Sequence, residues 1–537
     1  MPVYVSLPGS KRGVLPHSRP AGPVDRSEVD SITVRVRSAG DMKELEKRVY
    51  EEAQKPLSER KYVSHDDLAA MNGAGAADLD KVEEFAQKHN LLVVHRSAAE
   101  RAIVLKGALG DLLDAFPAQL SMYHHSNGTY RGRVGEIKVP QELDGIVTGV
   151  FGYDTHPKHR APHRRKNGLN GPGGQNGVAA TDFAKRYNFP TALNGTALDG
   201  TGQTVAIIEL GGGFRNSDLT LFFKEIGVPT PTVTSISVDH AGNAPSTPDS
   251  ADGEVMLDIE VAGAVAPKAR FAIYYGPNRG DKGFLDAISA AVHDRQRKPS
   301  VISISWGGPE STADQQSIDA FHELFVAAAA LGITICAASG DHGTADLDAA
   351  DWDGKIHVDH PSVDPMVIAC GGTQIDGSNQ DEVWNDGTPF DINSQDGGGW
   401  ASGGGISELF ALPSYQANAK VPNSLDNGKP GRGVPDIAMS ATNYFTRVDT
   451  FEGASGGTSA VAPLMAALVA RLNQAKKKNV GFLNPFLYSN VAKGVVHDVT
   501  KGTNAITNTV KGYDAGTGWD ACTGLGTPDG TAILNNL

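Results

Sequence analysis

The feature that most constrains the fold is an alternation of short apolar segments with longer helical ones between residues 204 and 370. Several apolar segments end in small or polar residues, as in T-V-A-I-I-E-L-G-G-G at 204–213 and S-V-I-S-I-S-W-G-G at 300–308. This alternation predicts a parallel sheet that is covered by helices on both faces. Sites in such sheets gather at the carboxyl ends of the strands. Glu209, Trp306 and Asp341 all fall at such ends.

The segment before residue 155 has a different order of elements. Strand patterns at 31–36, 91–95, 102–105, 119–124 and 130–139 surround helical patterns at 41–54, 65–89 and 109–115. This order predicts an α+β unit with a split βαβ, ferredoxin-like fold. Residues 1–29 are polar and proline-rich and are expected to form a loose arm. Nothing in this unit looks catalytic.

Residues 155–177 separate the two units. The run H-P-K-H-R-A-P-H-R-R-K is strongly basic, and N-G-L-N-G-P-G-G-Q-N-G has the composition of a linker. The basic run could contact nucleic acid or a membrane, but in so acidic a chain an exposed, protease-accessible connector is favoured. We therefore predict a domain at 1–154, a cleavable linker at 155–177 and a second domain at 178–537.

Composition excludes several classes of protein. The net charge of −14 argues against general nucleic-acid binding. No apolar run is long enough to span a membrane, and the three distant cysteines predict neither a disulfide framework nor a metal-ligand pair. The first residues contain no apolar core of a signal peptide, which alone favours a cytoplasmic protein or an unusual export route.

A second conspicuous stretch runs from Phe451 to Leu472, F-E-G-A-S-G-G-T-S-A-V-A-P-L-M-A-A-L-V-A-R-L. Its glycines permit close backbone approach, and a helical pattern then continues to about residue 478. Ser459 therefore stands at the start of a buried helix, where unpaired N–H groups and the helix dipole favour a developing negative charge. That position suits a serine nucleophile, and it suits a serine that only caps a core helix equally well.

Two carboxylates share one face of the helix predicted at 253–265. Glu254 and Asp258 are four residues apart, which places their Cβ atoms about 5–6 Å from each other. Much of this helix is apolar, so acids within it need partners. An ordinary surface pair of acids is the alternative. Glu260 lies on a different face and is expected to be solvated.

The same helix carries V-A-G at 261–263, which follows the base histidine in the H-G-T-H-V-A-G pattern of subtilisin-like proteases. Here Glu254 stands where that histidine would be expected. Jointly very specific motifs, in order through the second domain, resemble the sedolisin family, the serine-carboxyl peptidases, and most closely its kumamolisin-like members. These motifs are A-I-I-E-L-G-G-G from Ala206, D-G-E-V-M-L-D-I-E-V-A-G-A-V-A-P from Asp252, S-V-I-S-I-S-W-G-G-P-E from Ser300, S-G-D from Ser339, G-R-G-V-P-D from Gly431 and G-G-T-S-A-V-A-P from Gly456. The first domain and the linker resemble that family's removable propeptide.

The resemblance implies a role for each conspicuous residue. Ser459 would be the nucleophile, Glu254 the general base and acid, and Asp258 the partner of Glu254. Asp341 would form the oxyanion hole, and it would have to be protonated because a carboxylate cannot stabilise an oxyanion. A glutamate near its usual pKa of about 4.3 is a useful base only in acid, so an acidic working pH follows.

Further roles follow from the same resemblance. Glu209 and Trp306 resemble outer members of the network that holds the base, although Trp306 is equally consistent with simple packing. Asp359, in H-V-D-H-P, matches a substrate-pocket acid of kumamolisin-like enzymes. The competing motif H-G-T at His342 would give histidine chemistry, but it follows a strand end and lacks the V-A-G helix.

A calcium site is implied near the C-terminus. The family's site would use the side chains of Asp498 and Asp520 and the carbonyls of Val499, Gly516 and Gly518. Carboxylates and carbonyls from the glycine-rich turn Y-D-A-G-T-G-W-D are hard oxygen ligands that suit one structural Ca²⁺. By spacing alone, such a loop is often a plain turn.

These features predict an acid-acting endopeptidase for protein and peptide substrates, made as a zymogen. Its own propeptide would inhibit it intramolecularly until self-cleavage in the linker. We expect a monomer without nucleic-acid or membrane partners, and secretion, because members of the family act outside the cell. The alternative, a protease-like binding protein that has lost activity, predicts a missing catalytic residue, whereas all four are present.

Overall fold

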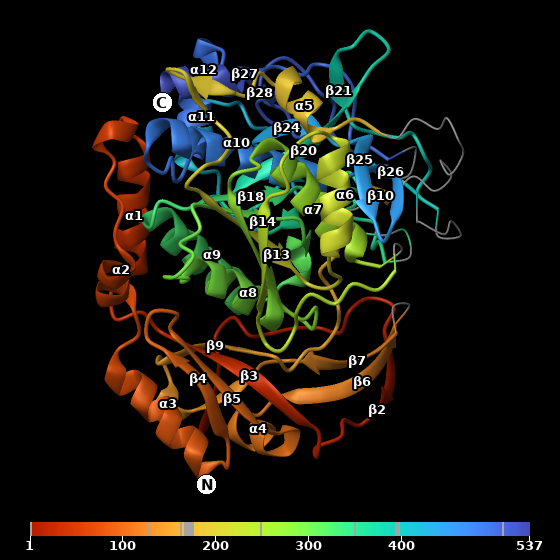
Figure 1. Cartoon of the computed structure of the whole chain (residues 1–537). Coiled ribbons are helices and arrows are strands. Elements are labelled where there is room, and N and C mark those ends of the chain that lie inside the picture. The colour runs from red at the N-terminus through yellow and green to blue at the C-terminus, as the bar shows by residue number, and fades with distance from the viewer. Residues whose placement is uncertain are drawn as a thin grey trace.

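The computed structural model describes residues 3–125, 128–161, 164–165, 177–247, 250–347, 349, 351–391, 398–506 and 510–537. A smaller N-terminal domain packs beneath a larger C-terminal one, and helices α1 (Met42–Ala53) and α2 (His65–Asn72) run along the side of the larger domain (Figure 1). In the described part of the chain, no helix is both long and apolar enough to cross a membrane.

The larger domain is built on a mostly parallel sheet with the strand order β14-β15-β13-β16-β18-β20-β21, and β24 also pairs with β20. Only the pairing of β20 with β21 is antiparallel. The doubly covered parallel sheet predicted from the sequence is confirmed. The strands are β13 (Thr204–Glu209), β14 (Thr232–Ser237), β15 (Arg270–Tyr275), β16 (Val301–Ile304), β18 (Thr334–Ala338), β20 (Ile368–Ile375), β21 (Asp381–Val383) and β24 (Ile437–Ser440).

Helices cover both faces of this sheet. One face packs against α7 (Asp252–Val265) and α10 (Val461–Lys476), and α5 (Ala180–Arg186) and α6 (Asn216–Glu225) pack on α7. The other face packs against α8 (Lys282–Val292) and α9 (Gln315–Ala330). Two shorter helices, α11 (Asn484–Ser489) and α12 (Gly530–Asn536), lie near the C-terminus.

Helix α7 is buried on every side, which corrects the expectation for Glu260. Instead of being solvated, Glu260 is fully buried and accepts a hydrogen bond from the backbone N–H of Arg447 at 3.0 Å. The reason is that α7 lies between α10, α5, α6 and strand β25 (Tyr444–Val448), so no face of the helix reaches water. The sequence of this helix shows its apolar character but not how many neighbours enclose it.

The N-terminal domain contains an antiparallel sheet with the order β4-β5-β3-β9. Strand β3 (Val29–Val36) is followed by three helices, then by β4 (Leu92–Ser97), β5 (Ala102–Ala108), α4 (Leu109–Ala115) and β9 (Val147–Phe151). This connectivity and order are those of the predicted ferredoxin-like fold. Helices α3 (Ala76–Lys88) and α4 pack on one face of the sheet.

The first 29 residues are not a loose arm. Strand β1 (Tyr4–Ser6) pairs with β8 (Lys138–Pro140), and β2 (Arg19–Gly22) pairs with β6 (Gln119–His125), which also pairs with β7 (Gly128–Val134). Backbone pairing with these distant strands orders a segment that has little apolar character of its own.

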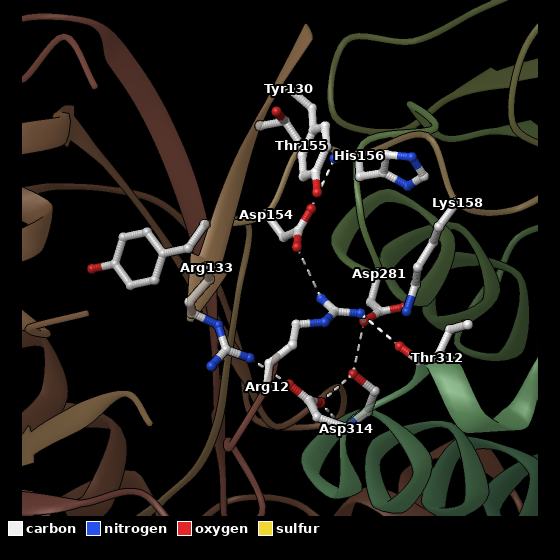
Figure 2. Close-up of polar contacts among 12 residues, drawn as sticks. Arg12, Tyr130, Arg133, Asp154, Thr155, His156, Lys158, Asp281, Thr312 and Asp314 are labelled. Carbon is white, nitrogen blue, oxygen red and sulfur yellow. Dashed lines mark hydrogen bonds and ion pairs between the residues drawn. The ribbon is translucent and has the colours of Figure 1, made fainter. Parts of the chain in front are cut away.

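The second face of the N-terminal sheet rests on α8 and α9, and buried ion pairs join the two domains (Figure 2). Arg133 Nη2 lies 2.5 Å from Asp314 Oδ2, and Arg12 Nη2 lies 3.8 Å from Asp281 Oδ2. The side-chain nitrogen of Lys158 lies 2.5 Å from the other oxygen of Asp281. Asp281 and Asp314 immediately precede α8 and α9, so these pairs fix the N-terminal domain to the starts of both helices.

The linker was expected to be exposed, and its described start is not. His156 and His159 are each only 6% exposed, and Lys158 is held in the ion-pair cluster. Charge complementarity to buried Asp281 draws Lys158 and His159 inward. The ring of His156 instead packs between Tyr130 and His125. Residues 166–176 of the predicted linker lie outside the described part of the chain, and the domain boundaries at 154/155 and 177/178 stay predictions.

Candidate active site

Ser459 lies between a strand and a helix in the core of the larger domain. Strand β26 (Phe451–Gly456) leads through Gly457 into a short 3₁₀ turn, Thr458–Ala460, from which α10 continues. Gly457 has φ 124°, a backbone conformation that side chains with a Cβ atom rarely adopt. Ser459 is fully buried, as expected for a residue at the start of a core helix.

The hydroxyl of Ser459 lies against the carboxyl group of Glu254 on α7. Burial raises the pKa of Glu254 well above its usual range, and the negative charges of Asp258, Glu209 and Asp341 act in the same direction. The Ser459 hydroxyl acts in the opposite direction. Among the described residues, neither Ser459 Oγ nor the two Glu254 carboxyl oxygens has a hydrogen bond of normal geometry. Such catalytic contacts often tighten only when substrate binds.

Asp258, one turn further along α7, is the second acid of this group. Its Oδ1 accepts a hydrogen bond from Ser305 Oγ at 2.9 Å, and the same hydroxyl lies 3.3 Å from the backbone oxygen of Ser459. Burial raises the pKa of Asp258 well above its usual range, although the Ser305 bond opposes this shift. The structure therefore brings together two acids whose protons are hard to remove and places both beside the candidate nucleophile.

Glu209 and Trp306 form the next layer. Trp306 Nε1 donates a 2.9 Å hydrogen bond to Glu209 Oε2, and both side chains are buried. Burial raises the pKa of Glu209, and the charge of Asp258 adds to that effect. Trp306 therefore does more than pack, because its indole N–H holds an acid of the group.

Asp341 lies three residues after β18 and contacts Thr458, the neighbour of Ser459. Its Oδ1 accepts hydrogen bonds from the backbone N–H of Thr458 at 2.7 Å and from the Thr458 hydroxyl at 2.8 Å. Asp341 is thus tied to the residue directly before Ser459. His342, the alternative base, instead packs its ring on Trp400 and Phe390, with centroids 4.7 and 6.2 Å away.

Asp359 belongs to a second group of buried acids behind Asp341. Burial raises the pKa values of Asp359 and Asp346 well above the usual range, and the charge of Asp341 adds to both shifts. The Asp359 carboxyl lies so close to the backbone of Gly307 that a Cβ atom there would come within 2.4 Å of it. Asp359 therefore packs directly against the backbone of Gly307.

The linker lies along two backbone segments that lead to Ser459, one at Gly307 and one at Ser455 and Gly456. These two segments are called the two walls. Arg160 forms an antiparallel bridge with Gly307, with N–H to O distances of 2.8 and 3.0 Å. Further on, strand β10 (Arg164–Arg165) pairs antiparallel with Gly456 and Ser455 of β26. Gly307 comes two residues after Ser305, which contacts Ser459, and Gly456 comes three residues before Ser459. An extended peptide is thus already paired with both walls.

Comparison of the chain with known proteins identifies the family to which it belongs. Residues 16–156 match the model "Pro-kumamolisin, activation domain", and residues 240–514 match the subtilase family. Kumamolisin from Bacillus sp. (strain MN-32) is 44% identical over 99% of this chain and 96% of its own length. The chain belongs to the sedolisin family of serine-carboxyl peptidases. It is a serine peptidase with an N-terminal activation domain, made as a zymogen.

More distant members agree with this assignment. Sedolisin from Pseudomonas sp. (strain 101) is 28% identical over 93% of this chain and 85% of its own length. A solved structure of Pseudomonas sedolisin, complexed with two molecules of pseudo-iodotyrostatin, has a TM-score of 0.57 and 29% identity. It covers 67% of this chain and 97% of that one.

The calcium ligands expected for a member of this family lie close together. Asp498 Oδ2 accepts from Gly518 N–H at 2.8 Å, and Asp520 Oδ2 accepts from Gly516 N–H at 3.1 Å, so both carboxylates meet one loop. Within the described residues, no group of three or more His, Cys, Asp or Glu side chains could hold a metal. A cation here would need backbone carbonyls, such as those of Val499, Gly516 and Gly518. Two converging carboxylates in a glycine-rich loop fit Ca²⁺.

Sequence reasoning missed several residues of this peptidase site. Ser305, which links Asp258 to Ser459, stands directly before Trp306 at the end of a predicted strand, and its position was the available signal. The sequence indicates Thr458 only as the residue before Ser459 in the motif G-T-S, without a role of its own. Asp346 follows Asp341 by five residues and gave no signal, because the loop between them folds back only in the tertiary structure.

Proposed function

We propose that this sedolisin-family peptidase is an endopeptidase that acts in acid. In this proposal Ser459 is the nucleophile, Glu254 the general base and then acid, and Asp258 the partner of Glu254. Protonated Asp341 forms the oxyanion hole. The observation that carries the proposal is the setting of Ser459: its hydroxyl lies against Glu254, and the charged groups that raise the pKa of that carboxyl are all acids.

The proposed chemistry is acyl transfer in two steps. As Ser459 Oγ attacks the carbonyl carbon of the peptide, Glu254 accepts its proton. Protonated Asp341 would donate a hydrogen bond from Oδ2 to the oxyanion, while Oδ1 still accepts its two hydrogen bonds from Thr458. Glu254 returns the proton to the leaving amine, and an ester with Ser459 remains. Water repeats the sequence and releases the second product.

The acidic working range is proposed from the role of Asp341, which must keep its proton to stabilise the oxyanion. The raised pKa of Glu254 acts in the opposite direction, because it moves the loss of the Glu254 proton to higher pH. Asp258 and Glu209 raise the pKa of Glu254 by their charges, so the group of acids shares protons. Catalysis needs Glu254 to accept a proton and Asp341 to keep one. Activity should therefore fall in strong acid, where Glu254 stays protonated, and again towards neutral pH, where Asp341 is deprotonated.

The linker pairing supports self-processing. Arg160 and Arg164 are paired with the two walls, so the bond to be cut is proposed to lie between residues 161 and 164. Until that bond is cut, the linker fills the cleft and the N-terminal domain acts as an intramolecular inhibitor. Mature enzyme would begin within the predicted linker and contain the domain predicted at 178–537.

Other features are proposed with this function. Asp359 would line the substrate cleft beside Gly307. One Ca²⁺ would be held by Asp498 and Asp520, with carbonyl oxygens of the same loops. The enzyme would be secreted and act as a monomer on protein and peptide substrates, without nucleic-acid or membrane partners.

The decisive experiment is Ser459→Ala in the full chain. The variant should fold and remain uncleaved on acidification, and its peptidase activity should fall by about a thousandfold or more, as for loss of a nucleophile. Ser440→Ala removes another buried serine hydroxyl and serves as the matched control. Retained self-cleavage in pure Ser459→Ala protein would refute the proposed nucleophile. Activity that rises towards neutral pH and disappears in His342→Ala would instead indicate a histidine base.

A further inference from the structure

The side chain of Arg160 makes an ion pair with an acid that sequence reasoning did not single out. While its backbone is bridged to Gly307, its Nη2 lies 2.5 Å from Asp351 Oδ2. The side chains of Arg160 and Asp351 are 30% and 12% exposed, so the pair is largely shielded from water. Backbone pairing and side-chain pairing thus act on the same residue of the linker.

The position of Arg160 relative to the cut bond follows from the two pairings. Arg160 is bridged to Gly307 on one wall, and Arg164 pairs with Gly456 on the other. A bond cut between residues 161 and 164 places Arg160 two to four residues before it, on the N-terminal side. A peptide substrate that takes the place of the linker would present its own side chain to Asp351 from that position.

Two side chains of the zymogen's N-terminal segments contact Asp351. Besides Arg160, His125 of the N-terminal domain brings its Nε2 to 3.4 Å from Asp351 Oδ1. Both partners belong to segments that leave the cleft when the propeptide departs. The carboxylate then remains on the catalytic domain. In the zymogen it lines a cavity of about 780 Å³ between the two domains, which the N-terminal segments help to enclose.

The neighbouring acids Asp346, Asp359 and Asp341 are more deeply buried than Asp351. Asp346 is buried and has its pKa raised well above the usual range, mainly by burial, and the charge of Arg160 opposes that shift. Asp359 and Asp341 lie beyond it. Because burial favours the neutral forms of Asp346 and Asp359, these two acids offer hydrogen bonds rather than charge, whereas Asp351 forms an ion pair with a basic side chain, that of Arg160.

We propose that Asp351 determines specificity: it selects substrates with Arg or Lys two to four residues before the cleaved bond. The inference rests on the proposed peptidase function and adds a substrate class to it. The backbone of the substrate pairs with Gly307 as Arg160 does, and its basic side chain forms the ion pair with Asp351. A neutral side chain leaves that carboxylate without its partner, and a glutamate is repelled by it.

The test uses enzyme that has processed itself from the full chain. Fluorogenic peptides of one parent sequence carry Arg, Lys, Gln or Glu in turn at each of the positions two, three and four before the cut bond, and kcat/KM is measured at pH 5. Wild type should favour Arg over Gln at one of these positions by about tenfold, the order expected for a shielded, charged hydrogen bond. Asp351→Asn should reduce that ratio to near one, and Asp351→Glu should retain the preference.

Asp353→Asn is the matched control, because it removes the same charge from the same cavity. It should leave the Arg to Gln ratio close to that of wild type. The proposal is overturned if wild type shows no preference for a basic residue at any of the three positions, or if Asp351→Asn keeps the preference. An equal loss in both variants would mean that the general charge of the cavity acts, which also contradicts a specific role for Asp351. An enzyme that cleaves none of the peptides would contradict the proposed peptidase function instead.

Discussion

At the scale of single residues, the unusual feature of this site is that its polar core consists almost entirely of acids. Glu254, Asp258 and Glu209 are buried within reach of one another's charges, and their pKa values are all raised. Burying an isolated ionised carboxylate is so costly that such groups hold protons instead. A site made this way can store and move protons in acid, where a histidine would be charged and unable to act as a base.

Glu254→Gln gives a sharp test because the same helix contains its own control. Glutamine resembles a protonated glutamate in shape but cannot take the proton of Ser459, so activity should fall by about a hundredfold or more. Glu260→Gln makes the same change six residues away, at a buried acid whose pKa burial also raises. Glutamine there can still accept the hydrogen bond from the backbone N–H of Arg447, so the variant should retain wild-type kcat/KM. Equal losses in both variants would indicate a structural effect on the helix rather than loss of a base.

Glu209→Gln should change the pH profile more than the maximal rate. Glutamine can still accept the hydrogen bond from Trp306, but it carries no charge, so one of the influences that raise the pKa of Glu254 is lost. The acid limb of the kcat/KM profile should therefore move to lower pH, by roughly one unit or less. Glu382→Gln, on edge strand β21, serves as the control. A limb that stays in place, or moves to higher pH, would contradict a coupling between Glu209 and the base.

At the scale of elements, the sequence predicted what depends on local pattern. The helix at 109–115 has the predicted bounds, and the apolar runs within 204–213 and 300–308 form strands β13 and β16, because turns or polar residues flank these short runs. The predictions that failed concern features that depend on tertiary contacts. The burial of Glu260, the pairing of the first 29 residues and the inward position of His156 all require partners that are distant in sequence.

The candidate site divides in the same way. Ser459, Glu254 and Asp341 could be proposed because each sits at a strand end or a helix start, where parallel sheets gather their sites. Asp346 and Asp351 could not, since an aspartate in a loop carries no periodic signal. Only the folded chain shows that Asp351 meets Arg160, which precedes it by 191 residues.

The loop around Asp498 and Asp520 supplies the prediction at this scale. If it binds Ca²⁺, chelation should lower the unfolding temperature of the mature enzyme by roughly 3–5 °C, because a ligand in large excess stabilises by a few kcal/mol. Restored Ca²⁺ should recover the loss. Asp498→Asn should make the protein insensitive to chelator, whereas Asp514→Asn, in the same segment, should respond like wild type. Scanning calorimetry with and without chelator measures this, and an unchanged wild-type curve would exclude the site.

At the scale of the whole molecule, the proposed function requires the N-terminal domain to stay bound at neutral pH and to leave in acid. The ion pairs of Figure 2 do not supply that response by themselves. Burial alone would raise the pKa of Asp281, but Lys158, His159 and Arg12 outweigh it and hold the pKa well below the usual range. Asp281 therefore stays ionised in mild acid, and its contribution to docking persists.

His156 is a group whose protonation opposes docking in mild acid. Its ring lies between Tyr130 and His125, at centroid distances of 4.7 and 5.2 Å, and neither ring nitrogen has a hydrogen-bond partner among the described residues. Burial lowers the pKa of His156 to about 3, and neighbouring positive charges add to this. The docked state thus keeps the ring neutral, while a released linker would have an ordinary pKa of about 6.5. Its contribution to docking is complete above that value and is lost as the pH falls towards about 3, by up to about tenfold in affinity per pH unit.

His156→Phe should therefore move release of the propeptide to lower pH. Phenylalanine keeps the aromatic packing against Tyr130 but takes up no proton, so the pH at which half of the zymogen becomes active should fall by about half a unit or more. The activation midpoint is measured by diluting the zymogen into buffers from pH 3 to 7 and following peptide cleavage. His124→Phe, at an exposed position beside His125 on the same strand, should leave the midpoint unchanged. Because a general loss of interface stability would raise the activation midpoint instead, the direction of the shift separates a proton-linked release from a damaged interface.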